Sequence, residues 1–331
     1  MVIPTLAAGK RLQECVEALE KQTQRDFEVI VVDNSAQGLA RSSGVGRPPV
    51  RVIEMPRNVG FGAAINEAFR QSRSPYLATL NDDAVPHPGW LAALVAALEA
   101  RPDAGMCASQ VRLYGEEALD SAGMLVCADG SSKQRGHLRP PEFFPVLEEV
   151  LFPSGSAALY RRATLEQVGL FDDEFFLYCE DTDLGLRARW AGWRCLYAPE
   201  AIVDHHYSHS AGRASPLKAY YVERNRLFVL AKNFPARMLP LVPFVSLARY
   251  AWHLAWMWRG RGAAARFRLE GGSAWRLPFY VMRAHGALLL HSAALWRQRR
   301  QIRRTARLSP RIYSRLLRAH SISARRVAEL A

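Results

Sequence analysis

The sequence contains few cysteines and no close pair of them. Its five cysteines are an odd number without a CxxC spacing: Cys15, Cys107, Cys127, Cys179 and Cys195. A disulfide framework or a structural zinc site needs such pairs, so both are excluded as the basis of the fold, and a reducing compartment is expected. The opening Met-Val-Ile-Pro-Thr also lacks the basic and apolar regions of a secretory signal, so the cytoplasm is the expected location.

Acidic side chains are scarce in the last third of the chain. From Ala211 onward there are 24 lysines and arginines against three glutamates, a net charge of +21, whereas residues 1–210 carry 20 basic and 28 acidic side chains, a net charge of −8. Hydrophobic residues make up 49% of the 331 residues, which is typical of a folded chain. We therefore expect two regions, 1–210 and 211–331, with different partners.

Residues 1–210 alternate between strand-like and helix-like segments. A β-branched run that ends in polar residues indicates a buried strand, and apolar residues at helical spacing indicate a helix. Strands are predicted at 2–3, 28–33, 51–54 and 76–80, and helices at 12–19, 62–72 and 88–100. This order is typical of βαβ units, so the sequence predicts an α/β fold with a mostly parallel sheet flanked by helices.

Three polar clusters follow predicted strands directly. They are Asp33-Asn34-Ser35, Arg57-Asn58-Val59-Gly60 and Asn81-Asp82-Asp83. In open α/β sheets, ligands bind in the crevice beyond the carboxyl ends of the strands. We therefore expect the clusters to line a binding site.

The cluster Asn81-Asp82-Asp83 favours a divalent cation. Adjacent carboxylates repel each other, and Mg²⁺ or Mn²⁺ is commonly shared between carboxylates and substrate phosphates. Such a cation would neutralise a diphosphate leaving group. The alternative is that the three residues only form a capped turn before the next helix.

The segment from Asn58 to Gly62 is a glycine-rich turn before a predicted helix. Backbone N–H groups of such a turn can approach a phosphate. A simple strand-to-helix turn uses the same residues, so this alternative stays open.

Glu180 and Asp181 stand at the start of a helix predicted over 184–191. Asp181 or Thr182 could serve only as the N-cap of that helix. A carboxylate among the preceding aromatic residues would also be partly desolvated and could take a proton from an acceptor hydroxyl as a general base. The two roles are compatible.

Three histidines, His205, His206 and His209, follow a strand-like segment at 201–203. No cysteine pair accompanies them, which disfavours zinc, but an imidazole can complete a mixed oxygen and nitrogen shell around Mn²⁺. For His209 we expect a position in a surface loop.

Taken in order, these motifs resemble the inverting family 2 glycosyltransferases of the GT-A fold. The matching stretches fall within residues 1–210, at 2–5, 31–35, 58–66, 80–83, 154–162, 171–187 and 205–206. The pattern FxxxFFLYxEDxDLxxR at 171–187 is most similar to bacterial rhamnosyltransferase-like enzymes. The resemblance implies a metal-dependent transfer of a sugar, most familiarly rhamnose, from a nucleotide-diphosphate donor. The acceptor would be a hydroxyl of a glycan or lipid-linked molecule in cell-surface polysaccharide synthesis.

The resemblance also assigns roles to single residues. Nucleotide-binding positions correspond to Asp33 at the base, Arg57, Asn58 and Gly60 in the turn, Asn81 near the ribose, and Asp82. The catalytic positions correspond to Asp181, the base, and Glu180. The ligands of Mg²⁺ or Mn²⁺ correspond to Asp83 and to His205 or His206, with His205 favoured by its spacing from Asp181. The implied mechanism is a single displacement that inverts the anomeric centre and needs one base.

Two departures from the family pattern leave alternatives open. The first strand is short, so a native start upstream of Met1 is one of them, and Asn81 replaces the first acid of the metal motif. A sugar-phosphate nucleotidyltransferase would need a basic glycine-rich loop near the first strand, of which 5–10 is a poor version. A non-catalytic nucleotide-sugar-binding subunit is the other alternative, and the intact Glu180-Asp181 pair disfavours it.

The region 211–331 is basic and rich in tryptophan. Its apolar stretches, 238–258 and 277–296, are interrupted by proline, arginine and histidine, so they are borderline for a membrane-spanning helix of about 20 residues. Tryptophan beside arginine clusters favours a helical region at an anionic membrane surface. A helical subdomain with a solvated basic face and a nucleic-acid patch are the alternatives; no nucleic-acid partner is expected. The oligomeric state is left open.

Overall fold

The computed structural model describes every residue except 8, 46–49, 207–214, 270–273 and 331. The chain divides into two compact units, each described here by itself. The first unit comprises Met1–Met124, Gln134–Ala188 and Trp193–Ser210, and the second comprises Leu125–Lys133, Arg189–Gly192 and Ala211–Ala331.

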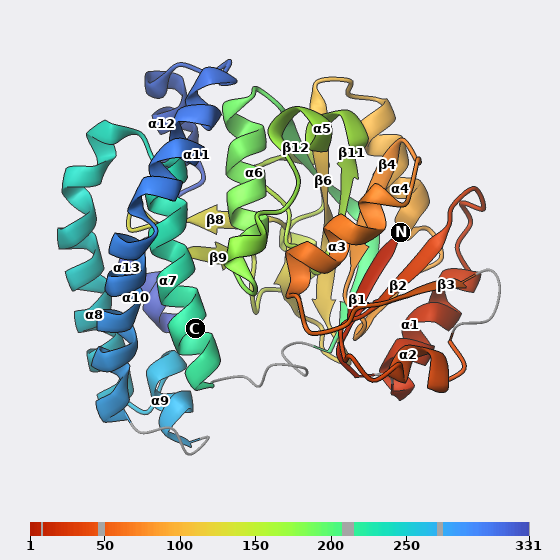
Figure 1. The fold of residues 1–331 in the computed structure, drawn as a ribbon, viewed down its shortest axis with the longest axis horizontal. Helices are drawn as coiled ribbons and strands as arrows, with labels where there is room; N and C mark the ends of the chain where they lie inside the picture. The colour runs from red at the N-terminus through yellow and green to blue at the C-terminus, as the bar shows by residue number, and fades with distance from the viewer. Residues whose placement is uncertain (8, 46–49, 207–214, 270–273, 331) are drawn as a thin grey trace. The chain divides into compact units, whose positions relative to one another are not determined.

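The first unit is built on a ten-stranded sheet (Figure 1). Its main strand order is β10-β12-β6-β11-β4-β1-β2-β3, with β5 paired to β12 and β7 paired to β6. The strands are β1 Val2–Thr5, β2 Val29–Asp33, β3 Val50–Glu54, β4 Tyr76–Leu80, β5 Ala84–Pro86, β6 Ala104–Leu113, β7 Leu119–Ser121, β10 Glu148–Val150, β11 Ala157–Arg161 and β12 Arg194–His205.

Six of the ten strands of this sheet, β1 to β4, β6 and β12, run in the same direction. The strands β4, β1, β2 and β3 lie side by side and are all parallel, and β6 is parallel to β12. Strand β11 lies between β4 and β6 and is antiparallel to both. The carboxyl ends of β1, β2, β4 and β12 therefore lie along the same edge of the sheet. This is the mostly parallel α/β fold that the alternation of segments predicts.

Alternate side chains of the strands face two helical layers. Ile3, Val31 and their neighbours pack with α1 (Lys10–Glu20) and α4 (Trp90–Glu99) on one face. Val2, Val32 and their neighbours pack on the other face with α3 (Phe61–Arg70), α5 (Arg162–Val168) and α6 (Glu180–Trp190). The shorter helices are α2 Leu39–Ser42, η1 Pro141–Phe143 and η2 Asp173–Phe175. Burial of both strand faces explains their continuous β-branched runs.

Two elements begin at least four residues earlier than the sequence predicts. The segment predicted as a strand at 201–203 is the end of the twelve-residue strand β12, whose pairing with β6 shifts register between Ala198 and Ile202. The intervening Pro199 and Glu200 interrupt the apolar pattern and hide the continuity. The helix predicted from 184 begins at Glu180, so its first turn carries both candidate catalytic carboxylates.

The second unit is helical (Figure 1). Its elements are α7 Pro216–Asn233, η3 Ala236–Leu241, α8 Val242–Trp258, α9 Gly262–Leu269, η4 Ala274–Arg276, α10 Leu277–Leu290, α11 Ser292–Arg304, α12 Pro310–Ala319 and α13 Ala324–Glu329. Helices α10 and α11 pack on α7, and α9 and α13 pack on α8. The segment 125–133 also belongs to this unit. It contains most of the paired strands β8 (Met124–Val126) and β9 (Ser132–Gln134) and the loop between them. None of the helices in the part of the chain described above has the length and apolarity to cross a membrane.

Candidate active site

The turn after β4 and the end of β12 meet at the carboxyl edge of the sheet. The His205 Nε2 atom lies 3.1 Å from Asp83 Oδ1 and 3.2 Å from Asn81 Nδ2. Asp83 and His205 are both buried, with exposed fractions of 5% and 6%. Two residues predicted as metal ligands, which are 122 positions apart in the sequence, are thus side by side.

The other ring nitrogen of His205 is held by Asp120, a residue that the motifs do not reveal. His205 Nδ1 lies 2.9 Å from Asp120 Oδ2, and Asp120 is itself 3.3 Å from the Gln134 amide and 3.4 Å from His137 Nδ1. Burial by itself would lower the pKa of His205, but the hydrogen bonds to Asp120 and Asp83 raise it to about 10. A carboxylate on the far nitrogen of an imidazole is the usual way to orient a metal-ligating histidine.

The donor atoms of Asp83 and His205 fit a divalent cation. Across the residues whose placement is known, no three His, Cys, Asp or Glu side chains form a ready-made metal cluster. A carboxylate and an oriented imidazole are nevertheless donors that Mn²⁺ accepts, and Mg²⁺ and Mn²⁺ sites commonly take their remaining ligands from substrate phosphates and water. The geometry therefore suits a cation that binds together with a diphosphate.

Asp82 points from the same turn toward the first strand. The Thr5 hydroxyl donates a hydrogen bond of 2.6 Å to Asp82 Oδ2. Burial, together with the charge of Asp83, raises the pKa of Asp82 to about 6 despite this bond. The end of β1 and the turn after β4 are in this way tied together.

Asp181 is held by backbone donors at the start of α6. Its Oδ2 accepts a hydrogen bond of 2.9 Å from Gly155 N–H, and its Oδ1 accepts one of 2.6 Å from Thr182 N–H. The residue after Gly155, Ser156, accepts a bond of 2.8 Å from Asn81 N–H. The segment 155–156 thus links the candidate base to the turn that carries Asp83.

Burial dominates the electrostatics of the carboxylate pair. It raises the pKa of Asp181, although hydrogen bonds from Gly155 and Thr182 act in the opposite direction. It raises the pKa of Glu180 to about 8, with a further contribution from the charge of Asp181. One Glu180 oxygen, Oε2, is buried without a hydrogen-bond partner. At neutral pH the pair therefore favours a protonated Glu180 beside Asp181.

The loop before α6 has a strained backbone. Phe176, Tyr178 and Cys179 all have positive φ angles, of 61°, 69° and 65°. The carbonyl of Phe176 accepts a hydrogen bond of 2.9 Å from Phe61 N–H, and a Cβ atom added to Gly60 would lie 2.2 Å from that carbonyl oxygen. Only glycine therefore allows the turn 58–60 to approach this loop, and strain of this kind is commonly found where a site is built.

Asp33 and Asn34 hold the carboxyl end of β2. Asp33 accepts hydrogen bonds of 2.8 Å from the N–H groups of Ser35 and Ala40, which lower its pKa against the effect of burial. The buried Asn34 side chain donates to the Gly60 carbonyl at 3.1 Å. The first two predicted clusters thus adjoin each other, as the strand-end rule predicts.

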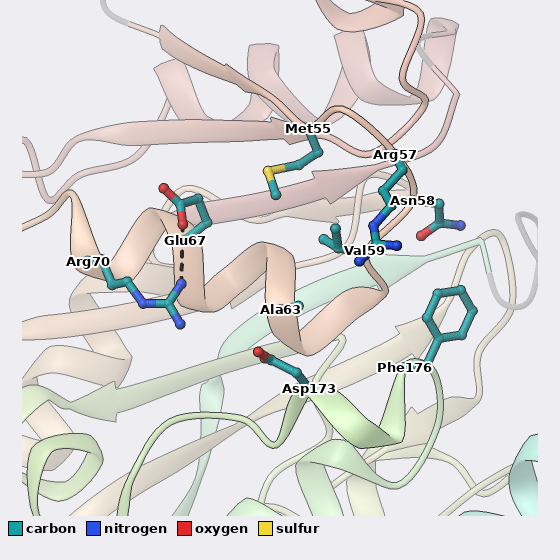
Figure 2. A pocket seen from close by; sticks show the side chains of 9 residues that line it. All are labelled: Met55, Arg57, Asn58, Val59, Ala63, Glu67, Arg70, Asp173 and Phe176. Atoms are coloured by element: carbon teal, nitrogen blue, oxygen red, sulfur yellow. Dashed lines mark hydrogen bonds and ion pairs between the residues drawn. The ribbon is translucent and has the colours of Figure 1, made fainter.

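Arg57 and Asn58 border a hollow of about 460 Å³ beside α3 (Figure 2). Their side chains lie at the end where Phe176 also lies, and the Glu67–Arg70 ion pair lies at the other end. The hollow is lined by Met55, Arg57, Asn58, Val59, Ala63, Glu67, Arg70, Asp173 and Phe176. This lining includes two predicted nucleotide-binding residues but neither Asp83 nor Asp181.

His206 has other surroundings than His205. The His206 ring stacks on Tyr114, with centroids 3.8 Å apart, and its Nε2 lies 3.8 Å from Glu14 Oε2. The backbone N–H of His206 donates a hydrogen bond of 3.0 Å to the backbone carbonyl of Asp83, so His206 lies beside this turn. Its ring, however, contacts different residues from the ring of His205. His209 lies outside the described residues.

Sequence comparisons relate the chain to known enzymes. Residues 1–169 match the family described as Glycosyl transferase family 2. The chain is 32% identical over 247 residues to N-acetylglucosaminyl-diphospho-decaprenol L-rhamnosyltransferase of Mycobacterium tuberculosis, a match that covers 67% of this chain and 80% of the relative. It is 23% identical over 215 residues to the O-antigen chain rhamnosyltransferase WbaN of Salmonella anatum, which covers 63% and 66%.

Solved structures share the fold at low sequence identity. GalNAc-T7 with UDP, GalNAc and Mn²⁺ superposes with a TM-score of 0.60 at 16% identity, over 75% of this chain and 50% of that one. Residues 1–349 of TarS from S. aureus, in complex with UDP, superpose with a TM-score of 0.53 at 16% identity, over 92% and 89%. The arrangement of strands and helices is therefore the GT-A fold. The chain belongs to glycosyl transferase family 2 and is a glycosyltransferase.

Proposed function

We propose that residues 1–210 form a metal-dependent, inverting glycosyltransferase domain, in which Asp181 is the base. The observation that carries this proposal is the position of Asp181, whose carboxylate is fixed by Gly155 and Thr182 and linked through Ser156 to the Asn81 turn. A single displacement at the anomeric carbon needs one group that takes the proton of the acceptor hydroxyl. A carboxylate with a raised pKa is well suited to that transfer.

The donor would lie along the carboxyl edge of the sheet. Asp33 would meet the base of the nucleotide, and the turn with Arg57, Asn58 and Gly60 would flank it. Asn81 and Asp82 follow β4 at the same edge and would face the ribose and the diphosphate. Backbone N–H groups before α3 add the positive end of a helix dipole to this region.

Asp83 and His205 would hold the divalent cation, Mg²⁺ or Mn²⁺. When bound, such a cation supplies charge neutralisation for the departing nucleoside diphosphate. Asp120 would keep the His205 imidazole oriented, with its Nε2 directed at the position beside Asp83. The solved structure of GalNAc-T7 contains Mn²⁺ and UDP, which supports this assignment by analogy of fold.

The protonation state of Glu180 would determine whether Asp181 can be ionised. A neutral Glu180 at pH 7 adds no second negative charge beside the base, so Asp181 can be the ionised member of the pair. Asp181 would then accept the acceptor's proton as the new glycosidic bond forms and the bond to the diphosphate breaks.

The donor sugar and acceptor are proposed from the relatives. The names of two relatives describe rhamnosyl transfer, one of them to N-acetylglucosaminyl-diphospho-decaprenol. We therefore propose transfer of rhamnose from a dTDP donor to a lipid-linked or glycan acceptor in cell-surface polysaccharide synthesis. The basic region 211–331 would bring the enzyme to the inner face of the cell membrane, where such an acceptor is found.

The direct test is a panel of dTDP-, UDP- and GDP-sugars incubated with the full chain and Mn²⁺. We expect release of nucleoside diphosphate from one donor class, loss of that release with EDTA, and an inverted anomeric configuration in the transferred product by NMR. Pyrophosphate formed from a nucleoside triphosphate would indicate the nucleotidyltransferase instead. Absence of turnover with every donor, with nucleotide binding retained, would indicate a non-catalytic binding subunit.

A further inference from the structure

Helix α8 presents an apolar stripe to the surroundings of the second unit. Phe244, Leu247, Leu254 and Trp258 have exposed fractions of 73%, 68%, 56% and 86%. They recur every three to seven positions, as residues on one face of a helix do. In water, a helix of a folded protein normally turns such a face toward the core.

The buried face of the same helix carries Ser246 and Arg249 beside Trp256. Arg249 is 7% exposed, and its guanidinium lies 2.6 Å from Asp129 Oδ2 and 2.8 Å from Glu223 Oε2. Arg226 and the Tyr250 hydroxyl also bond to Glu223. Helix α8 therefore buries a paired charge, while four of its large apolar side chains stay exposed.

The buried charges fix how α8 is rotated. Asp129 comes from the loop 125–133 and Glu223 from α7, so the Arg249 guanidinium is held by two other elements of the unit. A buried charge without its partners is strongly destabilising, so the helix cannot turn its apolar stripe inward without losing both ion pairs. The ion pairs of Arg249 therefore keep the apolar stripe of α8 exposed.

The positive charge of the second unit favours an anionic partner for the apolar stripe. Arg259 and Arg261 follow α8 directly, and exposed arginines recur on α11 and α12, at 297, 300, 304, 311, 315 and 318. The region from Ala211 onward has a net charge of +21. Apolar side chains that enter a lipid layer, combined with arginines that meet its headgroups, are the hallmark of a helix lying in an anionic membrane surface.

We propose that α8 lies in the plane of an anionic lipid bilayer, with Phe244, Leu247, Leu254 and Trp258 inserted among the acyl chains near the headgroups. This inference rests on the membrane location in the proposed function and deepens it. Membrane binding then has two parts, an electrostatic part that salt weakens and an apolar part from α8 that salt leaves in place.

The test uses the full chain and vesicles of phosphatidylcholine with 0 or 30% phosphatidylglycerol, sedimented at 50 and 500 mM NaCl. We expect wild type to bind the anionic vesicles and to retain a fraction of that binding at 500 mM NaCl. The double variant Phe244→Ser with Leu247→Ser should lower the partition coefficient at least tenfold and lose the salt-resistant fraction. The matched control, Phe143→Ser with Leu147→Ser, removes an exposed Phe and Leu of the first unit (61% and 51% exposed) and should bind like wild type.

Brominated lipids provide a second readout. Tryptophan emission of wild type should be quenched on binding, and Trp258→Phe should remove a large part of that quenching. Equal binding by both double variants, or quenching that Trp258→Phe leaves unchanged, would overturn the proposal. A dimer in light scattering that the α8 double variant dissociates, with no vesicle binding by wild type, would assign the stripe to a second copy. Donor hydrolysis is measured in parallel, so loss of vesicle binding with hydrolysis intact would leave the catalytic proposal standing.

Discussion

Replacing Glu180 by glutamine should remove a pH-dependent loss of stability. Burial and the neighbouring Asp181 raise the pKa of Glu180 from 4.5 to about 8. Between these values the unfolded chain is ionised at this residue while the folded chain retains the proton. The contribution of Glu180 to the free energy of unfolding is thus at its maximum below pH 4.5. It falls by about 1.4 kcal/mol per pH unit as the pH rises toward 8.

Relative to wild type, the unfolding free energy of Glu180→Gln should therefore rise by about 3 kcal/mol between pH 5.5 and pH 7.5. This value is an upper bound for a fully buried carboxyl group. Urea unfolding at pH 5.5, 6.5 and 7.5 at constant ionic strength measures it. Glu116→Gln, which removes an exposed carboxylate of the same unit, should follow wild type. Parallel stability curves for wild type and Glu180→Gln would refute the protonated state assigned to Glu180.

Two further substitutions test contacts at the carboxyl edge of the sheet. Gly60→Ala places a Cβ atom 2.2 Å from the Phe176 carbonyl oxygen at a residue with a φ of 88°, so it should lower both the melting temperature and the transfer rate. The control Gly89→Ala, whose added Cβ atom would have no neighbour within 4 Å, should change neither. Similar melting temperatures for the two variants would contradict the close approach of Gly60 to Phe176. Asp120→Asn should loosen His205, which it orients, and so weaken Mn²⁺ binding about 10- to 100-fold in an EPR titration. The control Asp204→Asn, which breaks the pair between Asp204 and His87, should leave Mn²⁺ binding unchanged. Equal affinities of the two variants would remove Asp120 from that role.

The residues at the strand ends could be predicted because their positions follow from local patterns. Asp33 and Asp83 each come after a β-branched or apolar run, and parallel strands bring such ends to one edge of a sheet. The same rule applies to His205, although Pro199 and Glu200 obscured the length of its strand. The contacts of Asp33 with its own turn, and of Asp83 with His205, required the three-dimensional arrangement.

The partners of His205 and Asp181 could not be predicted from the sequence, because they are distant from these residues along the chain and follow no periodic pattern. Asp120 meets His205 across 85 positions and comes from a strand of three residues, which is too short to show a periodicity. Gly155 meets Asp181 across 26 positions through its backbone N–H, a group that every residue except proline carries. The positive φ of Phe176 runs against the preference of its residue type, so only the structure reveals it.

Helix α8 shows a different limit. The sequence favoured a helical region at a membrane surface, but its pattern did not show which residues of the helix are buried. The structure buries Arg249, because partners for its charge come from α7 and from the loop 125–133. Which face of a helix is buried depends on what the rest of the unit offers to it.

The most direct measurement of the central claim is the transfer rate of Asp181→Asn, with donor binding measured separately. With the base removed and the fold retained, kcat should fall by about 10² to 10⁴ while the dissociation constant of the sugar nucleotide with Mn²⁺ stays close to that of wild type. Such a separation is expected if Asp181 acts on the acceptor hydroxyl and the donor is held by Asp33, Asp83 and His205. Normal turnover by Asp181→Asn would contradict the account.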